Sequence, residues 1–241
     1  MKLSFSTMRL LHECPHCYVN KISGIKQPES IYLTEGKIAH GIAQRHVSGV
    51  EAHPALEHIT LTFAVVEKRD FDPDCKFLVP VGQDLALLNV EDFCTCDFPD
   101  EKDGQCRKCG KEIPPYVILG FIDGLDKKVS DEPTVMLECK FSGSPWSLGK
   151  YKKDPQRKIY GWAMRTVKTA YLITGKRKPE EWETIKPVTR KVDFTEQDYK
   201  DAEEWMAEAI RRIENKEFYS DLVNGKCVDP RCYWGERCMF K

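Results

Sequence analysis

Two β-rich segments close together in the chain constrain the fold most strongly. Tyr116–Lys127 reads YVILGFIDGLDK, Thr134–Phe141 reads TVMLECKF, and the turn-forming residues VSDEP join them. Both segments are rich in β-branched and large apolar side chains, which is typical of strands. The pattern therefore predicts a hairpin whose two strands are largely buried.

Helical and strand-like patterns surround this hairpin. The chain has 241 residues, of which 41% are hydrophobic, so it can bury a sizeable core and still be one domain with an insertion. We therefore predict an α/β fold, with helices flanking a mixed sheet, in a single domain over residues 1–241. Thr195 and Asp198 form a capping-box pattern that starts the last helix. The expected helices are residues 5–22, Leu33–Val47, Lys153–Thr174 and Thr195 to about Phe218, and the other expected strands are Ile59–Val66, Lys76–Val90 and Trp182–Val192.

Residues 91–115 (EDFCTCDFPDEKDGQCRKCGKEIPP) differ in composition from the rest of the chain. Their four cysteines lie among charged and turn-forming residues, with no apolar period that could sustain a core element. Cys94 and Cys96 form one close pair, Cys106 and Cys109 another, as a small closed site of four thiolates around Zn²⁺ requires. We expect an inserted zinc knuckle. The other interpretation, free thiols on a charged loop, leaves a reactive segment with no core of its own.

The net charge and the hydropathy of the chain limit its cellular location and the classes of partner that it binds. A net charge of −1 creates no global attraction to nucleic acid, so any DNA contact must be local, and Lys150–Lys158 and Lys176–Lys178 are the candidate stretches. No apolar run approaches the roughly 18 residues that span a bilayer, and the N-terminal residues are too charged for a signal peptide. We expect a cytoplasmic protein with no membrane partner. The odd number of cysteines, eleven, and the close clustering of most of them favour metal binding over disulfides, while Cys75 and Cys139 have no partner by spacing.

The ECK tripeptide in the second strand of the hairpin brings two functional groups together. Side chains at i and i+2 of a strand share a face, so the Glu138 carboxylate should lie beside the Lys140 ammonium. With Asp123 from the hairpin partner, two carboxylates form an all-oxygen cradle suited to Mg²⁺ or Mn²⁺. Lys140 can then orient or deprotonate an attacking water, or offset charge on a scissile phosphate. Taken alone, the tripeptide is also compatible with an ordinary charge pair at an exposed strand edge.

These residues also carry a resemblance to a known family. GFIDGLD, then VMLECKF, then QRKIY on the next helix resemble, in order, the motifs of PD-(D/E)XK nucleases of the RecB type. Upstream, LTEGKIAH resembles the glycine-spaced histidine motif of that group, and LHECPHCY resembles its N-terminal Cys-Pro-x-x-Tyr segment, although here Cys17 directly precedes Tyr18. With the cysteines of the tail, the pattern resembles the CRISPR-associated exonucleases and AddB-type nuclease domains, which hold an iron–sulfur cluster. The resemblance covers residues 4–47 and 116–241 and implies a restriction-endonuclease-like fold.

The resemblance implies which residues bind the catalytic metal. It makes Asp123 and Glu138 ligands and His40 an additional ligand, and an imidazole ligand favours Mn²⁺ relative to a purely carboxylate site. Cys139 lies between the two catalytic residues, so its carbonyl rather than its thiol is the expected metal contact. For His40 the alternative is a buried, hydrogen-bonded core histidine.

The resemblance also implies which residues act on the substrate. Lys140 becomes the catalytic lysine, and Gln156 and Tyr160 complete the site. Because they are four residues apart, Gln156 and Tyr160 share one helix face, where they can grip a substrate phosphate or steady the lysine and the water. The alternative is a solvated glutamine and a packing tyrosine.

The tail sequence CVDPRCYWGERC holds a second cysteine cluster. Cys227, Cys232 and Cys238 are closely spaced, and the resemblance makes Cys14 the fourth ligand of a [4Fe–4S] cluster. Such a cluster would tie the first helix to the last segment and would have a structural role. Two alternatives stay open: tetrahedral zinc on the same four thiolates, and Cys17 in place of Cys14.

The leading hypothesis is a metal-dependent DNA nuclease, an exonuclease acting on single-stranded DNA or DNA ends. Recombination, repair, phage replication and CRISPR adaptation are the expected settings, with helicase, recombination or CRISPR proteins as partners. The alternative is a nucleic-acid-binding structural subunit with a nuclease-like fold and little or no cleavage. A third hypothesis, a redox or regulatory iron–sulfur protein, explains the cysteines but leaves the carboxylates and the lysine without a purpose.

Overall fold

The computed structural model describes residues 1–59, 61, 63–65, 76–89, 91–96, 100–126 and 134–217. Helices and mixed sheets make up this part of the chain, so the α/β class is confirmed. Within it, no helix combines the length and the apolar character needed to cross a membrane. In chain order the elements are β1 (Lys2–Ser4), α1 (Phe5–Glu13), α2 (Pro15–Ile22), α3 (Ile31–Val47), the 3₁₀ helix η1 (Pro54–Leu56), β2 (Ala64–Val65), β3 (Lys76–Val81), β4 (Glu101–Lys102), β5 (Gln105–Cys106), β6 (Tyr116–Phe121), β7 (Gly124–Leu125), β8 (Val135–Ser142), α4 (Leu148–Lys152), α5 (Pro155–Ala163), β9 (Thr169–Lys176), the 3₁₀ helix η3 (Pro179–Glu183), β10 (Val188–Asp193) and α6 (Glu196–Glu214).

The chain divides into two compact units. The first contains Met1–Pro28, Phe77–Gly120 and α6 from Glu203 onward. The second contains Glu29–Lys76 and Phe121–Ala202. All the residues that the sequence predicts at the catalytic centre belong to the second unit.

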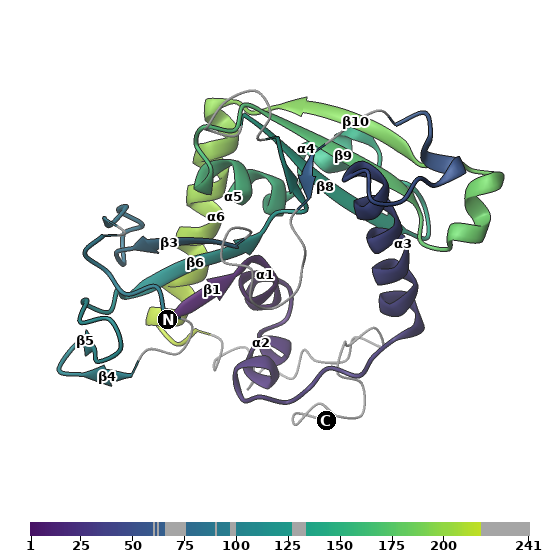
Figure 1. Ribbon diagram of the computed structural model, residues 1–241. Coiled ribbons are helices and arrows are strands. Elements are labelled where there is room, and N and C mark those ends of the chain that lie inside the picture. Colours follow the sequence, from purple (N-terminus) through teal and green to yellow (C-terminus); the bar gives the residue numbers. More distant parts are fainter. Residues whose placement is uncertain are drawn as a thin grey trace. The chain divides into compact units, whose positions relative to one another are not determined.

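A five-stranded mixed sheet, in the order β10-β9-β8-β7-β2, is the framework of the second unit (Figure 1). β8 and β9 are parallel and pair from Val135↔Thr169 to Ser142↔Lys176. The β7–β8 and β9–β10 pairs are antiparallel. β8 therefore has a hydrogen-bonded neighbour on each side, which agrees with the largely buried strand expected from its apolar sequence.

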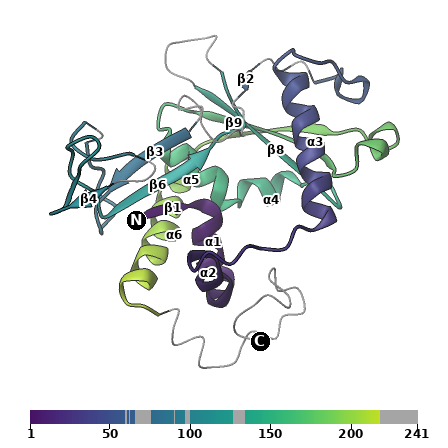
Figure 2. The same cartoon turned by 60° about the horizontal axis from the view of Figure 1, so that its bottom comes forward.

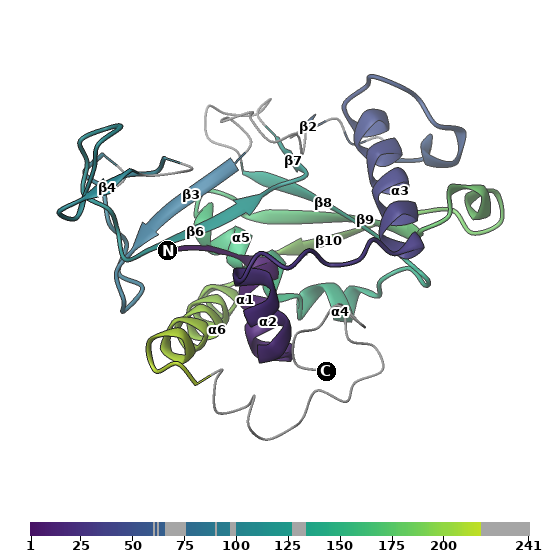
Figure 3. The ribbon, with the colours of Figure 1, turned by 90° about the horizontal axis from the view of Figure 1, so that it is seen from below.

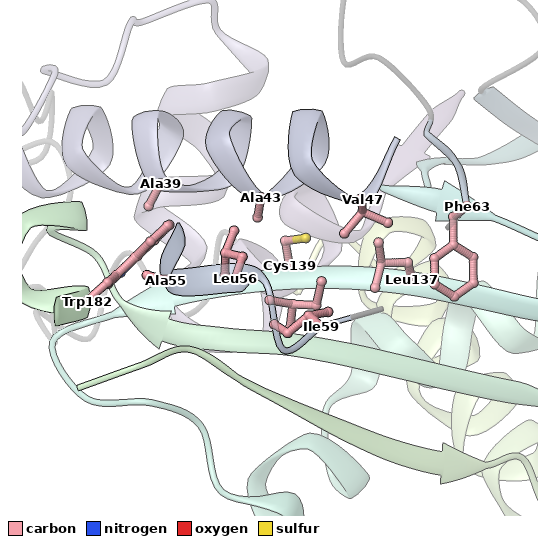
Figure 4. Close-up of a cluster of buried hydrophobic side chains, with 11 residues drawn as sticks. Ala39, Ala43, Val47, Ala55, Leu56, Ile59, Phe63, Leu137, Cys139 and Trp182 are labelled. Carbon is pink, nitrogen blue, oxygen red and sulfur yellow. The ribbon is translucent and has the colours of Figure 1, made fainter. Parts of the chain in front are cut away.

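Helix α3 crosses one face of this sheet (Figure 2). Its alanines Ala39 and Ala43, four residues apart, face Leu137 and Cys139 of β8 (Figure 4). Because side chains alternate along a strand, Glu138 lies on the opposite face of the sheet. The buried cluster under α3 comprises Ala39, Ala43, Val47, Ala55, Leu56, Ile59, Phe63, Leu137, Cys139, Ile173 and Trp182.

The first unit contains a three-stranded sheet in the order β1-β6-β3 (Figure 3). β1 is parallel to β6, with Leu3 paired to Ile118. Helices α1 and α2 contact each other. In this unit the Trp205 ring of α6 stacks on Phe5 and on His12, at centroid distances of 5.6 and 4.2 Å. The second half of α6 therefore packs on α1 through aromatic contacts.

The helix at residues 5–22 was expected as one element, and that prediction is wrong in one respect. The structure has two helices, because Cys14 is extended, with φ −156° and ψ 98°. A proline disfavours the α conformation of the residue before it, and Pro15 occupies the first position of α2, where its missing N–H costs nothing. The sequence CP therefore ends one helix and starts the next.

The expected helix Lys153–Thr174 is a larger error. Helix α5 ends at Ala163, and the chain then forms strand β9, which is hydrogen-bonded to β8 and β10. Residues 169–176 (TAYLITGK) are mostly buried and rich in β-branched and aromatic side chains. A continuous apolar run suits a buried helix and a central strand equally well in sequence, and strand pairing decides between them.

Three expected strands have different bounds in the structure. Tyr116–Lys127 is interrupted at residues 122–123, so that β6 pairs with β1 while β7 pairs with β8. The segment near Trp182–Val192 forms a strand only from Val188, and Trp182 lies in η3. In the described part of Lys76–Val90, residues 76–89, only β3 is a strand.

Several predictions fall partly or wholly on residues outside the described ranges. These are the VSDEP turn, part of the strand Ile59–Val66, the end of the last helix at Phe218, and the tail cysteines Cys227, Cys232 and Cys238. The expected start of the last helix is confirmed. Thr195 and Asp198 exchange hydrogen bonds as a capping box does, with each backbone N–H donating to the other side chain at 3.0 and 3.2 Å.

Candidate active site

The functional side chains of β8 lie on the face opposite α3. Glu138 and Lys140 share that face, as their spacing in the strand predicts, and Lys140 Nζ lies 2.6 Å from Glu138 Oε1. Asp123 stands at the interruption between β6 and β7, next to the residue pair Gly124↔Leu137. Asp123 and Glu138 are buried, each 3% exposed, whereas the Lys140 side chain is 20% exposed.

Helix α5 supplies the groups that hold the lysine and the glutamate. Gln156 Oε1 accepts a hydrogen bond from Lys140 Nζ at 2.6 Å, and Gln156 Nε2 donates to Glu138 Oε1 at 3.0 Å. The same amide nitrogen lies 2.9 Å from the Tyr160 hydroxyl. Gln156 thus links the strand residues to Tyr160 one helical turn later.

A second group gathers around Asp123. Cys139 N–H donates to Asp123 Oδ2 at 2.8 Å, and His40 Nε2 of α3 lies 2.8 Å from the same oxygen. A ring nitrogen of His40, a carboxylate oxygen of Asp123 and the sulfur of Cys139 all lie within 4.8 Å of one another. The Cys139 sulfur is buried in the apolar cluster under α3 (Figure 4). Its backbone, in contrast, already contacts Asp123.

Burial sets the electrostatics of this site. Burial and the charge of Asp123 raise the pKa of Glu138 to about 7, although Lys140 acts in the opposite direction. Burial lowers the pKa of Lys140, but the charges of Glu138 and Asp154 outweigh it, and the pKa is raised overall. Burial and the charge of Glu138 raise the pKa of Tyr160. At neutral pH the lysine is therefore an ammonium and the tyrosine a neutral hydroxyl.

The donor set fits a hard divalent cation. His40 Nε2 lies 2.8 Å from Asp123 Oδ2 but is buried without a hydrogen-bond partner among the described residues, so both atoms fit a shared cation. Glu138 Oε2 is buried and has no hydrogen-bond partner in the described part of the chain. An unsatisfied buried carboxylate oxygen is costly without a cation. Carboxylate oxygens with one imidazole suit Mg²⁺ or Mn²⁺.

Sequence reasoning missed Asp154, the N-cap of α5. Its Oδ1 accepts from Gln156 N–H at 3.3 Å, and its buried Oδ2 has no hydrogen-bond partner among the described residues. Burial raises the pKa of Asp154, and its charge contributes to the raised pKa of Lys140. The sequence Asp-Pro, an N-cap followed by proline at the first helical position, was the available signal. Asp154 therefore fixes the start of the helix that presents Gln156.

The two basic stretches differ in how far their charges are neutralised. Lys150 is exposed and its Nζ lies 4.1 Å above the Trp146 ring, and Lys140 Nζ lies 5.8 Å from the same ring. Arg177 and Lys178 pair instead with Glu35 of α3, at 2.9 and 3.8 Å. The stretch Lys150–Lys158, through its exposed lysines at 150, 152 and 153, therefore offers more positive charge to an anionic ligand than Lys176–Lys178 does.

The cysteines expected to bind metal fall into two groups. The sulfurs of Cys94, Cys96, Cys106 and Cys109 all lie within 4.8 Å of one another, as the spacing of the two pairs predicts. Cys14 is half-buried between α1 and α2, whereas the competing Cys17 is buried. The tail cysteines lie outside the described residues, so the iron–sulfur site stays a prediction.

The comparison with known families agrees with this geometry. A family model described as PD-(D/E)XK nuclease superfamily matches residues 2–239, nearly the whole chain. No curated protein matches the chain. The matched range includes the carboxylates, the lysine and the helix that carries Gln156. The chain therefore belongs to the PD-(D/E)XK nuclease superfamily, whose members are typically metal-dependent nucleases.

Proposed function

We propose that this chain is a divalent-metal-dependent deoxyribonuclease that hydrolyses phosphodiester bonds at Asp123, Glu138 and Lys140. One observation carries the proposal. Glu138 is buried, and Lys140 and Gln156 bind one of its oxygens, whereas the other oxygen has no hydrogen-bond partner among the residues that the structure describes. A merely structural ion pair would satisfy both oxygens or lie at the surface. Asp123 and His40, whose Oδ2 and Nε2 atoms lie 2.8 Å apart, are the further ligands of the divalent cation in this proposal.

Each residue has a task that follows from its contacts. A bound Mg²⁺ or Mn²⁺ supplies a water of lowered pKa and positive charge for phosphate oxygens. Asp123 and Glu138 present the oxygen ligands, and His40 and the Cys139 carbonyl complete the set. Cys139 N–H orients Asp123 through the 2.8 Å hydrogen bond.

Lys140 and its partners on α5 act on the substrate side. Two acceptors, on Glu138 and Gln156, hold the Lys140 ammonium in place. Its charge can offset the negative charge that develops on the scissile phosphate. Gln156 and Tyr160 steady the lysine through the contact between the Gln156 amide and the Tyr160 hydroxyl.

DNA is the substrate class that this site and the family favour. The exposed lysines of residues 150–153 flank the segment that leads into α5, so they can contact backbone phosphates beside the active site. Because the charge of the whole chain is −1, binding should depend on this local patch and weaken strongly with salt. We propose exonuclease action on single-stranded DNA or ends, in recombination, repair, phage replication or CRISPR adaptation.

The test is a cleavage assay with four substrates. Purified protein is incubated with end-labelled single-stranded and double-stranded DNA and with their circular counterparts, in Mg²⁺, Mn²⁺ or a chelator. We expect metal-dependent release of short products from linear DNA, fastest on single strands in Mn²⁺, and no cleavage of circles. Cleavage of circles would replace the exonuclease proposal with an endonuclease. Tight DNA binding without cleavage in either metal would favour the structural-subunit alternative.

A further inference from the structure

We propose that Cys94, Cys96, Cys106 and Cys109 hold one zinc ion in a closed site of four thiolates. This site belongs to the first unit and does not rest on the proposed nuclease function. The structure describes residues 91–96 and 100–115 of the knuckle. Four sulfurs from two separate pairs lie within 4.8 Å of one another, in a segment with no apolar core of its own. Thiols on a loop without a common ligand have no reason to converge.

The backbone of the knuckle shapes the site before any metal binds. β4 and β5 form a hairpin whose turn residues Asp103 and Gly104 have φ of +54° and +78°, as a tight primed turn requires. Gly110 follows the second cysteine pair with φ +73°, a conformation that costs a glycine little. Cys94 N–H donates to the Glu112 carbonyl at 2.7 Å, which closes the knuckle across its two ends. These turns bring both pairs to one point.

The distances favour a single ion over a cluster. A tetrahedral ion with metal–sulfur bonds of about 2.3 Å places its sulfurs about 3.8 Å apart. The 4.8 Å limit on all sulfur pairs accommodates that spacing. A four-iron cluster binds each thiolate to a different iron and so spreads the four sulfurs farther apart. The knuckle is therefore too compact for the kind of cluster expected in the tail.

A backbone hydrogen bond holds one of the four sulfurs in place. Cys96 N–H donates to Cys94 Sγ at 3.4 Å. Backbone donors to sulfur orient the ligands in metal sites.

The chemistry of the ligands selects zinc. Four thiolates are soft donors, which disfavour Mg²⁺ and favour Zn²⁺. All four positions of a tetrahedral ion would be filled by protein, so no position remains for water or substrate and the role is structural. A zinc ion with four thiolates carries a net charge of −2, and Arg107, Lys108 and Lys111 lie within or next to the second pair to offset it.

The experiment measures metal content in the full-length protein. We compare the parent with Cys109→Ser, which changes an exposed ligand, and use Cys17→Ser as the control for a buried cysteine outside the knuckle. Zinc per chain should fall by about one in Cys109→Ser and stay unchanged in Cys17→Ser. Parent protein reconstituted with Co²⁺ should show the intense visible absorption of a tetrahedral thiolate site, and the Cys109 variant should lose it.

A second variant covers the case in which Cys109→Ser fails to fold. Replacing residues 94–109 with a short linker removes all four ligands, and the protein should stay soluble with about one zinc fewer per chain. Hydrogen exchange of β8 amides should match the parent. Equal zinc content in the parent and both variants would overturn the proposal. Loss of iron instead of zinc would overturn the identity of the metal, and an insoluble deletion would contradict the self-contained knuckle.

Discussion

At the scale of the single residue, the proposed role of Glu138 as a metal ligand conflicts with its burial. Burial and the nearby Asp123 disfavour its charge, yet a ligand for a divalent cation must be ionised. Lys140 and Gln156 offset part of the cost by donating to Oε1. Sites that bind metal commonly retain such a conflict, because the stability lost in the empty protein is regained when the cation binds.

This conflict predicts a pH dependence of the metal-free protein. The pKa of Glu138 is about 7 in the folded chain, above its usual 4.5, so the folded state binds the proton more tightly than the unfolded state. The associated stability is present below pH 4.5 and is lost as pH rises through about 7. In chelator, the Tm should fall between about pH 5 and about pH 8. Glu138→Gln should flatten this slope, and an unchanged slope in thermal melts would contradict the raised pKa.

The catalytic assignment makes a separate prediction. Asp123→Ala, Glu138→Ala and Lys140→Ala should each lower the cleavage rate by about 100-fold or more, because each removes metal binding or transition-state charge stabilisation. Circular dichroism should show that all three remain folded. The exposed Lys168 of the same unit offers the control, and Lys168→Ala should cut at the parent rate. Parent-like cleavage by any of the three variants would disprove the assignment.

Helices α5 and α6 are joined within the second unit by a buried ion pair. Arg157 NH2 of α5 lies 2.5 Å from Asp198 Oδ1, and the two side chains are 1% and 12% exposed. The other Asp198 oxygen caps α6 through Thr195. The Asp198 carboxylate therefore caps the start of α6 and also holds α5, the helix that carries Gln156, in place.

Removing this carboxylate should be costly. Asp198→Ala leaves the buried Arg157 without its partner, which typically destabilises a protein by about 3 kcal/mol or more, and it also removes the helix cap. Asp201, one turn later, is a matched control because its pair with Lys158 is partly exposed. Asp201→Ala should cost less than about 1 kcal/mol. Urea unfolding measures the free energy of unfolding of both variants. Equal losses would show that the Arg157–Asp198 pair contributes no more to stability than the Lys158–Asp201 pair.

At the scale of the whole molecule, the predicted iron–sulfur site connects the beginning of the chain to its end. Cys14 is extended and half-buried at the junction of α1 and α2, a position that leaves its thiol available to a ligand. Linking it to the tail cysteines would close a loop of about two hundred residues. Metal binding that joins distant segments contributes directly to folding stability.

We therefore expect protein purified without oxygen to be brown and to contain about four irons per chain. Cys14→Ser should release the iron and lower the Tm, since serine is a poor ligand for iron. Cys17→Ser should keep its iron, because that side chain is buried in the first unit. A colourless anaerobic preparation with two zinc ions per chain would instead support zinc in the tail, in addition to the knuckle.

Features that depend on short spacings could be predicted from the sequence. The shared face of Glu138 and Lys140 follows from the two-residue period of a strand, and the link from Gln156 to Tyr160 follows from the helical period. The capping box at Thr195 and the convergence of the knuckle cysteines have similarly local causes. Each needs only neighbours along the chain, so periodicity and turn chemistry suffice.

Other features were decided by partners far away in the sequence. The apolar run of β9 could have been helix or strand, and pairing with β8 and β10 made it a strand. The interruption at Asp123 exists because β6 and β7 pair with different strands. The second role of Asp154, beside Lys140, depends on where α5 packs. The sequence by itself determined which groups share a strand or helix face, whereas tertiary structure decided which faces meet, because burial and strand pairing join residues that no local period relates.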